Sequence, residues 1–359
     1  MRGTNSGAMN SVPASLAGIR VMVLGGYGYP DSFEWHVTES LTFLGCTVQL
    51  FHRRENSAGI LNVAGKAFDK LASSFMREPE RLGESRLIKM VRDFSPAVVL
   101  VLLGNQVSPK TIEKIRGTTH APIVCWCQDQ MTTLGRQYLL GSRFDAVFVK
   151  DRYMQDLFSR MIRSTQFHYL AEACNPRMHR PIDLSAEDQY RFGCDVMLAG
   201  SLYYYRQEIL ESLADLDLKI WGYRPDWLID RLAGRFMGRD VHGDDKVRAA
   251  LAAKICLNTL HYAEVDGLNC RAFEIAGCGG FQLASDVPSM AEHFEPDIEI
   301  VTFRSVEELA EKARHFMRNP EAARQIADRG RIRAHRDHTY EHRLVEILRV
   351  ALGQVPTRY

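Results

Sequence analysis

The sequence lacks long apolar runs, a secretory signal and an excess of either charge. No apolar stretch reaches the roughly 20 residues of a membrane-spanning helix, and residues 1–17 are small and polar. Lysine plus arginine number 45 and aspartate plus glutamate 44, so the formal net charge is +1. Such a balance creates no overall field that would attract nucleic acid or anionic lipid. We expect a disordered leader over 1–17, no membrane span and no nucleic-acid partner.

Cysteine is present, but without the spacing of a disulfide framework or a zinc site. The eight cysteines are scattered, include no Cys-x-x-Cys pair and mostly lie in apolar runs. Thiols in this setting are typically buried and reduced. We therefore expect free thiols, no metal ligated by cysteine and a cytoplasmic location.

Short apolar runs alternate with amphipathic segments along the whole chain. The expected strands are 19–25, 47–51, 97–103, 122–127, 145–150, 167–171, 194–200, 218–222, 254–260, 281–284 and 298–303. Helical patterns lie between most of them. Continuous apolar strands separated by helices are typical of parallel sheets that are covered on both faces. The sequence thus predicts an α/β fold with two doubly wound, Rossmann-like domains facing a central cleft.

The domain boundaries follow from one break in this alternation. Residues 172–192 contain two prolines and many charges without any period, which indicates a linker. We expect Rossmann-like domains over 18–171 and 193–337, and a final helix within 338–359 that can pack back toward the N-terminal domain. Ligands of such sheets bind beyond the carboxyl ends of the strands, so the cleft between the domains is the expected site.

The stretch GLNCRAFEIAGCGGFQLA, at 267–284, combines an expected helix, three glycines and a strand. Arg271 and Glu274 are three residues apart, so they share one face of a helix. If the helix begins near Asn269, its free N–H groups face the cleft and can bind phosphate. Arg271 can bond the same phosphate, and Glu274 can accept hydrogen bonds from the hydroxyls of a ribose. A surface ion pair on a capped helix is the alternative.

Other stretches extend this pattern into a family resemblance. They are LAGSLYYYRQEIL (198–210), LKIWG (218–222) and FEPDIEIVTFRSVEELAEKARHFMRNPEAARQIADRGRIRAHRDHTYEHR (294–343). From about Cys194 to Arg343 the chain resembles the CgeB-like glycosyltransferases, which are related to the wider GT-B enzymes that use nucleotide sugars. The likeness is looser before residue 170, in SFEWHVTESLTFLGCTV and VCWCQDQ.

The resemblance implies an acceptor-side N-terminal domain and a donor-binding C-terminal domain. It also implies that Glu274 holds the donor ribose and that the start of its helix faces the diphosphate. Many retaining members carry a second acid eight residues earlier, which contacts the donor sugar. That position is Asp266 here, with Glu264 close by. This departure leaves the sugar contact and the stereochemical outcome open, and it leaves room for a non-catalytic nucleotide-sugar-binding protein.

Further donor-site candidates follow the first two strands of the second domain. Gly200 and Ser201 lie where a backbone loop can approach a phosphate, and Arg206 can reach the diphosphate. A capped helix with a solvated arginine is the alternative. Trp221 or Tyr223 can stack on a nucleobase, although either residue can equally belong to the core.

Acceptor-site candidates lie in the first domain. Glu34 and His36 lie in the first helix turns, at the end of LGGYGYPDSFEWH, and Asp129 lies near the end of PIVCWCQDQ; each can face the acceptor or take its proton. The glycines of the first loop do not form a dinucleotide fingerprint, because Asp31 occupies the third glycine position. This mismatch argues against a Rossmann-type oxidoreductase, the remaining alternative.

Two patterns that imitate metal sites are set aside. Asp215 and Asp217 precede their strand and so lie at the wrong end of the sheet, and His338 with His342 has no third ligand. The predicted activity is therefore metal-independent transfer of a sugar from a nucleoside-diphosphate sugar to a hydroxyl. No cofactor beyond this donor substrate is expected, and the acceptor can be a glycan, a small molecule or a protein.

Overall fold

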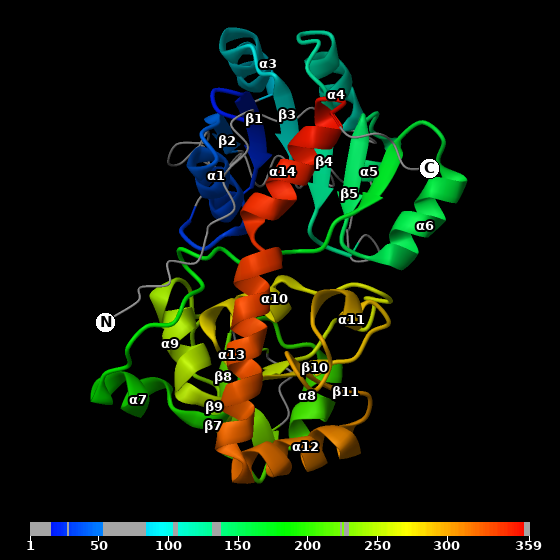
Figure 1. Cartoon of the computed structure of the whole chain (residues 1–359). Helices are drawn as coiled ribbons and strands as arrows, with labels where there is room; N and C mark the ends of the chain where they lie inside the picture. Colours follow the sequence, from blue (N-terminus) through cyan, green and yellow to red (C-terminus); the bar gives the residue numbers. More distant parts are fainter. Residues whose placement is uncertain are drawn as a thin grey trace, which may run out of the picture.

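The computed structural model describes residues 16–26, 29–52, 84–102, 107–130, 138–222, 225 and 230–354. The chain forms two lobes, each built on one parallel sheet with helices on its faces (Figure 1). The strand orders are β2-β1-β3-β4-β5-β6 and β11-β10-β9-β7-β8, and every pairing between these strands is parallel. The predicted architecture of two doubly wound α/β domains is confirmed.

The N-terminal sheet is buried along most of its length. Its strands are β1 (Arg20–Gly25), β2 (Thr47–His52), β3 (Val98–Val101), β4 (Ile123–Cys127), β5 (Ala146–Val149) and β6 (Gln166–Tyr169). The covering helices are α1 (Phe33–Phe43), α3 (Glu84–Phe94), α4 (Pro109–Arg116), α5 (Tyr138–Gly141) and α6 (Arg152–Met161). The strand order reverses at β1, which lies between β2 and β3, so the loop after β1 opens at the switch point where ligands bind.

The C-terminal sheet repeats this plan. Its strands are β7 (Cys194–Ala199), β8 (Leu218–Trp221), β9 (Ala253–Asn258), β10 (Gln282–Ser285) and β11 (Val301–Phe303). The accompanying helices are α8 (Tyr204–Glu211), the 3-10 helix η2 (Asp230–Arg235), α9 (Asp244–Ala252), α10 (Cys270–Cys278), α11 (Met290–His293), α12 (Val306–Arg318) and α13 (Pro320–Asp337). Its switch point lies between β7 and β9, so the loops after these two strands face the other lobe.

The final helix, α14 (Tyr340–Ala351), leaves the C-terminal lobe and packs on the N-terminal one. It continues from α13 along both lobes (Figure 1). Leu344 and Ile347 are fully buried in the same apolar cluster as Val37 and Leu41 of α1. The chain thus crosses between the lobes a second time.

The expected linker contains a helix that the sequence analysis did not predict. Helix α7 (Ala186–Phe192) begins at a capping box in which the Ser185 and Asp188 side chains bond each other's backbone N–H groups. Phe192 is fully buried in the core of the second lobe. The prolines and charges of this segment suggested a linker. Its capping box was not recognised because the capping acid is aspartate rather than the more common glutamate.

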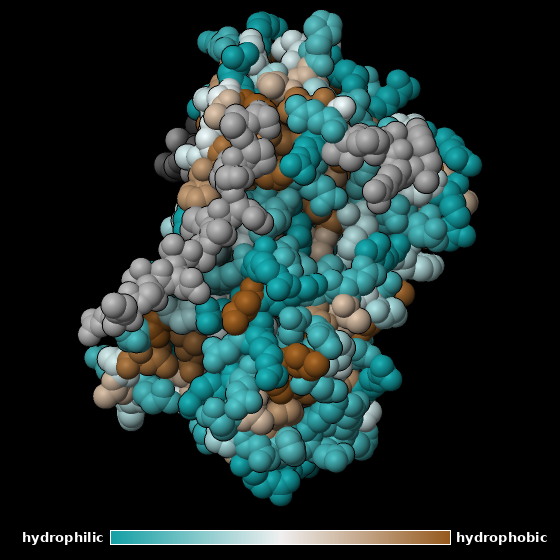
Figure 2. All heavy atoms as spheres, viewed as in Figure 1, coloured by the Kyte–Doolittle hydropathy of each residue, from teal (hydrophilic) through white to brown (hydrophobic). Residues whose placement is uncertain are grey.

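The surface and the thiols agree with the composition. Hydrophilic residues dominate the face drawn in Figure 2, where apolar residues form small separate patches. All eight cysteines are free and seven of them are buried, as predicted. Among the described residues, no helix combines the length and the apolarity that crossing a membrane requires.

The packing of α14 predicts that its apolar face stabilises the N-terminal domain. Leu344→Ala should lower the free energy of unfolding by about 2–5 kcal/mol, because it leaves a cavity in a closed core. Ile332→Ala in α13 is the control, because Ile332 is 54% exposed and should change stability by less than about 0.5 kcal/mol. Thermal and urea unfolding measure both changes, and equal effects of the two substitutions would contradict this packing.

Candidate functional site

Helix α10 begins where the sequence predicted and lies inside the molecule. The Asn269 side chain caps it by accepting a hydrogen bond from Ala272 N, and Gly279 ends it with a positive φ of 87°. Glu274 is only 8% exposed. Within the described part of the chain Glu274 and Arg271 form no ion pair with each other, so the alternative of a surface ion pair is wrong.

Arg271 bonds backbone carbonyls at the carboxyl edge of the second sheet. Its Nη1 donates to the carbonyl of Ala199, at the end of β7, over 2.9 Å, and its Nη2 donates to that of Thr259, just after β9, over 3.3 Å. Gly200 has a φ of 114°, and a Cβ on it would lie 2.5 Å from Arg271 Nη1. Glycine is therefore required at this position both for its backbone conformation and for the approach of the guanidinium.

Arg206 is a second guanidinium at the same edge, and it is buried. It donates to Thr259 Oγ1 over 2.6 Å, to the carbonyl of Thr259 over 2.9 Å and to that of Ser201. Burial, together with the neighbouring charge of Arg271, lowers the pKa of Arg206 to about 9. Neither arginine pairs with a carboxylate among the residues that the structure describes. The edge therefore carries two positive charges that an anion would satisfy.

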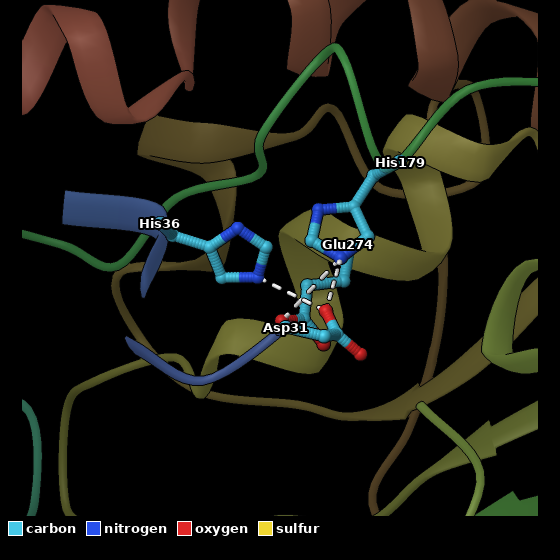
Figure 3. A group of neighbouring side chains, drawn as sticks. All are labelled: Asp31, His36, His179 and Glu274. Carbon is cyan, nitrogen blue, oxygen red and sulfur yellow. Dashed lines mark hydrogen bonds and ion pairs between the residues drawn. The ribbon is translucent and has the colours of Figure 1, made fainter. Parts of the chain in front are cut away.

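On the other side of Glu274 lies a buried network built from both lobes (Figure 3). Lys246 Nζ, from α9, is 3.2 Å from Glu274 Oε2 and 2.8 Å from Asp31 Oδ1. Asp31 and His36 come from the N-terminal lobe, and His36 Nε2 lies 3.0 Å from Asp31 Oδ1. His179, from the segment that connects the lobes, approaches both carboxylates, at 3.5 Å from Asp31 and 3.7 Å from Glu274.

The charges in this network follow from its contacts. Burial alone would raise the pKa of Asp31, but hydrogen bonds from His179, His36 and Lys246 outweigh it and lower that pKa. Burial also opposes ionisation of Glu274, whereas the charge of Lys246 lowers the pKa of Glu274. Burial, aided by Lys246, lowers the pKa of His179 to about 4. At neutral pH both carboxylates are ionised and His179 is uncharged.

The geometry favours an ion-pair network over a metal site here. The Nδ1 atom of His179 accepts from Asn175 N, and that of His36 accepts from Asn175 Nδ2. The Asn175 amide is oriented by Arg177 N, which donates to Asn175 Oδ1. In each ring Nε2 therefore carries a proton and has no lone pair for a metal. The four side chains whose ligand atoms lie within 4.8 Å of one another are Asp31, His36, His179 and Glu274.

A small cavity joins the arginine edge to this network. It has a volume of about 20 Å³ and is lined by Lys246, Arg271, Glu274 and apolar side chains. That is room for about one water molecule. A nucleotide in this place would require the lobes or these side chains to move apart.

A larger hollow, of about 360 Å³, lies at the opposite edge of the N-terminal sheet. Arg116, Arg143 and Arg163 line it beside the first residues of β5 and β6. Active sites of doubly wound sheets lie at the carboxyl edge, so we place the candidate site at the small cavity instead.

A second cluster of charged side chains connects the two lobes around Lys150, which lies directly after β5. Its Nζ lies 3.0 Å from Glu264 and 3.6 Å from Glu172, and all three side chains are buried. Burial raises the pKa of Glu172 to about 8, against the opposing charge of Lys150. The second oxygen of Glu264, Oε2, is buried without a hydrogen-bond partner. Asp266 instead accepts from Ser289 N over 2.7 Å.

Several predicted residues occupy other roles. Trp221 is 3% exposed and packs against Phe192 in the core, so it is not a base-stacking surface. Glu34 is buried and accepts from Gly26 N over 2.9 Å, which orients the loop after β1 rather than a ligand. His36 is also buried, and its Nε2 lies 3.0 Å from Asp31 Oδ1. Ser201 and Asp129 are exposed.

The remaining candidates are the two patterns set aside as metal sites and one residue that the structure does not describe. Asp215 pairs with Arg314 and Asp217 with Arg235, at the amino end of β8. His342 Nδ1 bonds Thr339 Oγ1 over 2.8 Å, whereas His338 Nε2 bonds the carbonyl of His293. Each of these four side chains thus contacts another protein group. Tyr223 lies outside the described residues.

Sequence reasoning missed Lys150, Glu172, His179 and Lys246, and noted Asp31 only as a break in a glycine motif. Each lies in a loop or an amphipathic helix without a local motif. The only available signal was position, because Lys150 and Asp31 both follow a buried strand of the first sheet. Position alone does not show which charges meet across two domains.

The raised pKa of Glu172 predicts a pH dependence of stability. Its pKa is about 8 in the folded protein against 4.5 ordinarily, so the folded state binds the proton more tightly. This contribution is complete below pH 4.5 and is lost as the pH rises to about 8. The free energy of unfolding of the wild type, relative to Glu172→Gln, should fall between these limits and then level off. Urea unfolding at a series of pH values measures the difference, and a constant difference would disprove it.

Comparison with known proteins supports the fold. A family model described as glycosyl transferase-like matches residues 206–349, which is less than half of the chain. A sequence search of the curated proteins finds no match.

Solved structures resemble the whole chain. A sucrose-phosphate synthase from Thermosynechococcus elongatus has a TM-score of 0.65 at 13% identity and covers 94% of this chain and 99% of its own. A glycosyltransferase from Rickettsia africae has a TM-score of 0.64 at 12% identity, with 94% and 98% covered. The Anabaena protein HepE, in complex with UDP and glucose, has a TM-score of 0.62 at 14% identity, with 92% and 99% covered. These likenesses confirm the predicted GT-B fold, and the family match agrees with the predicted glycosyltransferase.

Proposed function

We propose that this protein is a glycosyltransferase that moves a sugar from a nucleoside-diphosphate sugar to an acceptor hydroxyl. The observation that supports it most is the buried position of Glu274, which shares a small cavity with Arg271. Arg271 and Arg206 lie at the carboxyl edge of the second sheet, and among the described residues neither pairs with a carboxylate. Glu274 and Arg271 both line the small cavity, and a carboxylate beside a guanidinium matches the hydroxyls and the diphosphate of such a donor.

The proposed binding mode follows from these charges. The diphosphate lies toward Arg271 and the N-terminus of α10, where the helix dipole and the guanidinium stabilise the charge of the leaving group. The ribose hydroxyls donate to Glu274, whose charge Lys246 compensates at 3.2 Å. No metal is needed in this mode, since cationic side chains stabilise the leaving diphosphate.

The proposal extends to the acceptor, the subgroup and the location. The acceptor, whether a glycan, a small molecule or a protein, enters from the N-terminal lobe, beside Asp129 and Glu264. The CgeB-like subgroup follows from the resemblance at 194–343, and a cytoplasmic location follows from the eight free thiols. HepE was solved with UDP-glucose, so UDP and UDP-glucose are the first donors to test.

A nucleotide-sugar-binding protein without catalysis is the second candidate. One observation favours it: the Asp266 carboxylate accepts a hydrogen bond from the Ser289 backbone, so it is not held ready for a donor sugar. The partnerless Oε2 of Glu264 favours catalysis, since an acid close to the expected position remains available. Slow release of free sugar from UDP-glucose without an acceptor would distinguish the enzyme from the binding protein.

Glu274→Gln is predicted to weaken binding of UDP roughly 10- to 100-fold, because it removes the charged acceptor of the ribose hydroxyls. The fold should persist, since Lys246 retains Asp31 as its partner at 2.8 Å. Calorimetric titration measures the affinity. Glu321→Gln, at an exposed position in α13, is the control and should bind as the wild type does. Unchanged affinity in Glu274→Gln would reject the assignment.

The second prediction concerns metals. Protein treated with EDTA and then freed of the chelator should hydrolyse UDP-glucose, or transfer its glucose, as fast as untreated protein does. The reason is that arginine and lysine supply the positive charge. Activity that is lost on treatment and restored by Mn²⁺ would overturn the metal-independent mechanism while leaving the transferase itself intact.

A further inference from the structure

We propose that Asp31 is a positioning residue for the donor site, through which the N-terminal domain sets Lys246 and Glu274. The inference rests on the proposed function, because it concerns the carboxylate that would hold the donor ribose. It assigns a role in donor binding to a residue of the opposite domain.

Asp31 supplies a helix cap that the C-terminal domain lacks. Helix α9 follows Gly243, its N-cap residue, which has a φ of 56° and no side chain to cap the helix. Asp31 Oδ2 accepts a hydrogen bond from Gly243 N over 2.7 Å, although the two residues are 212 positions apart. A carboxylate at a helix N-terminus also interacts favourably with the helix dipole. The first turn of α9, which carries Lys246, is therefore completed by the other domain.

Asp31 itself is held in an uncommon conformation. Its φ is 72°, in the left-handed region where only a few per cent of residues other than glycine lie. Such conformations persist where surrounding contacts hold them, and they gather at functional sites. The contacts that hold this one all lie in the network, because its carboxylate meets Gly243 N, Lys246, His36 and His179.

Lys246 transmits the position of Asp31 to Glu274. Its Nζ lies 2.8 Å from one carboxylate and 3.2 Å from the other, and its side chain is 16% exposed. A lysine on a flexible four-carbon chain has many rotamers, so two carboxylates define its position better than one does. When ribose hydroxyls bond to Glu274, Asp31 still anchors the ammonium group beside it. Without Asp31, the lysine would be free to leave the donor carboxylate.

The groups that face Asp31 do not replace its charge. His179 is uncharged at neutral pH, His36 bonds Asp31 through Nε2, and His179 Nε2 lies 3.5 Å from Asp31 Oδ1. Lys246 has no other anionic partner than Asp31 and Glu274 among the described residues. Removing the charge of Asp31 therefore changes both the position of Lys246 and the cap of α9.

The test compares UDP binding by the wild type and by Asp31→Asn in calorimetry. Asp31→Asn should raise the Kd at least about fivefold, which is the lower end of ordinary coupling between sites. Glu292→Gln is the matched control, because it removes another carboxylate that pairs across the domains, with Arg152, away from Glu274. The control should leave the Kd within about twofold.

A double-mutant cycle separates positioning from general stability. If Asp31 acts through Lys246, then Asp31→Asn should change the Kd for UDP no further in a Lys246→Met background. A role in the fold alone would make the two changes additive. Asp31→Glu, which keeps the charge but displaces it by one methylene, is the second variant should Asp31→Asn fail to fold. It should weaken UDP binding less than the loss of the charge does.

Hydrogen exchange gives a readout that needs no donor. Asp31→Asn should speed exchange of the amides in the first turn of α9 relative to both wild type and Glu292→Gln. A wild type that binds neither UDP nor UDP-glucose would overturn the proposed function together with this role. A wild type that binds, with an unchanged Kd in Asp31→Asn, would overturn the role of Asp31 only.

Discussion

One ammonium group makes the candidate site possible. Lys246 pairs with Asp31 from one domain and Glu274 from the other, at 2.8 and 3.2 Å. A buried carboxylate without a partner would be protonated or would destabilise the fold by several kcal/mol. Because both acids share this cation, Glu274 can stay ionised at the domain junction. The start of α9, the loop after β1 and the inner face of α10 are all arranged around that pairing.

The site separates its charges across the first turns of α10. Arg206 and Arg271 place positive charge at the ends of β7 and β9, whereas Glu274 and Asp31 place negative charge on the other side. A nucleoside diphosphate has the same division, with anionic phosphates beside hydroxyl groups that donate hydrogen bonds. Under the proposed function, this polarity orients the donor before any contact with the base. It also accounts for Gly200, whose missing side chain leaves room for Arg271.

The two crossings between the domains meet at one place. Cys174 N donates to the carbonyl of His338 over 2.9 Å, and Tyr340 N donates to that of Cys174 over 3.0 Å. The connecting segment and the junction of α13 with α14 are thus bonded to each other. If the two domains move apart, they have to rotate about this junction, because both connecting segments pass through it. His179, four residues beyond Asn175, extends from the same segment into the charged network.

By itself the sequence determined the two parallel sheets and the start of α10 at Asn269. Continuous apolar strands, caps and glycine stops are local signals, so neighbouring residues are enough to reveal them. Only the tertiary structure decided that Trp221 belongs to the core, that Asp266 bonds a backbone amide and that Asp31 reaches Lys246. Asp31 and Lys246 lie 215 positions apart, and no local pattern encodes a pairing that arises only when two separately folded sheets meet.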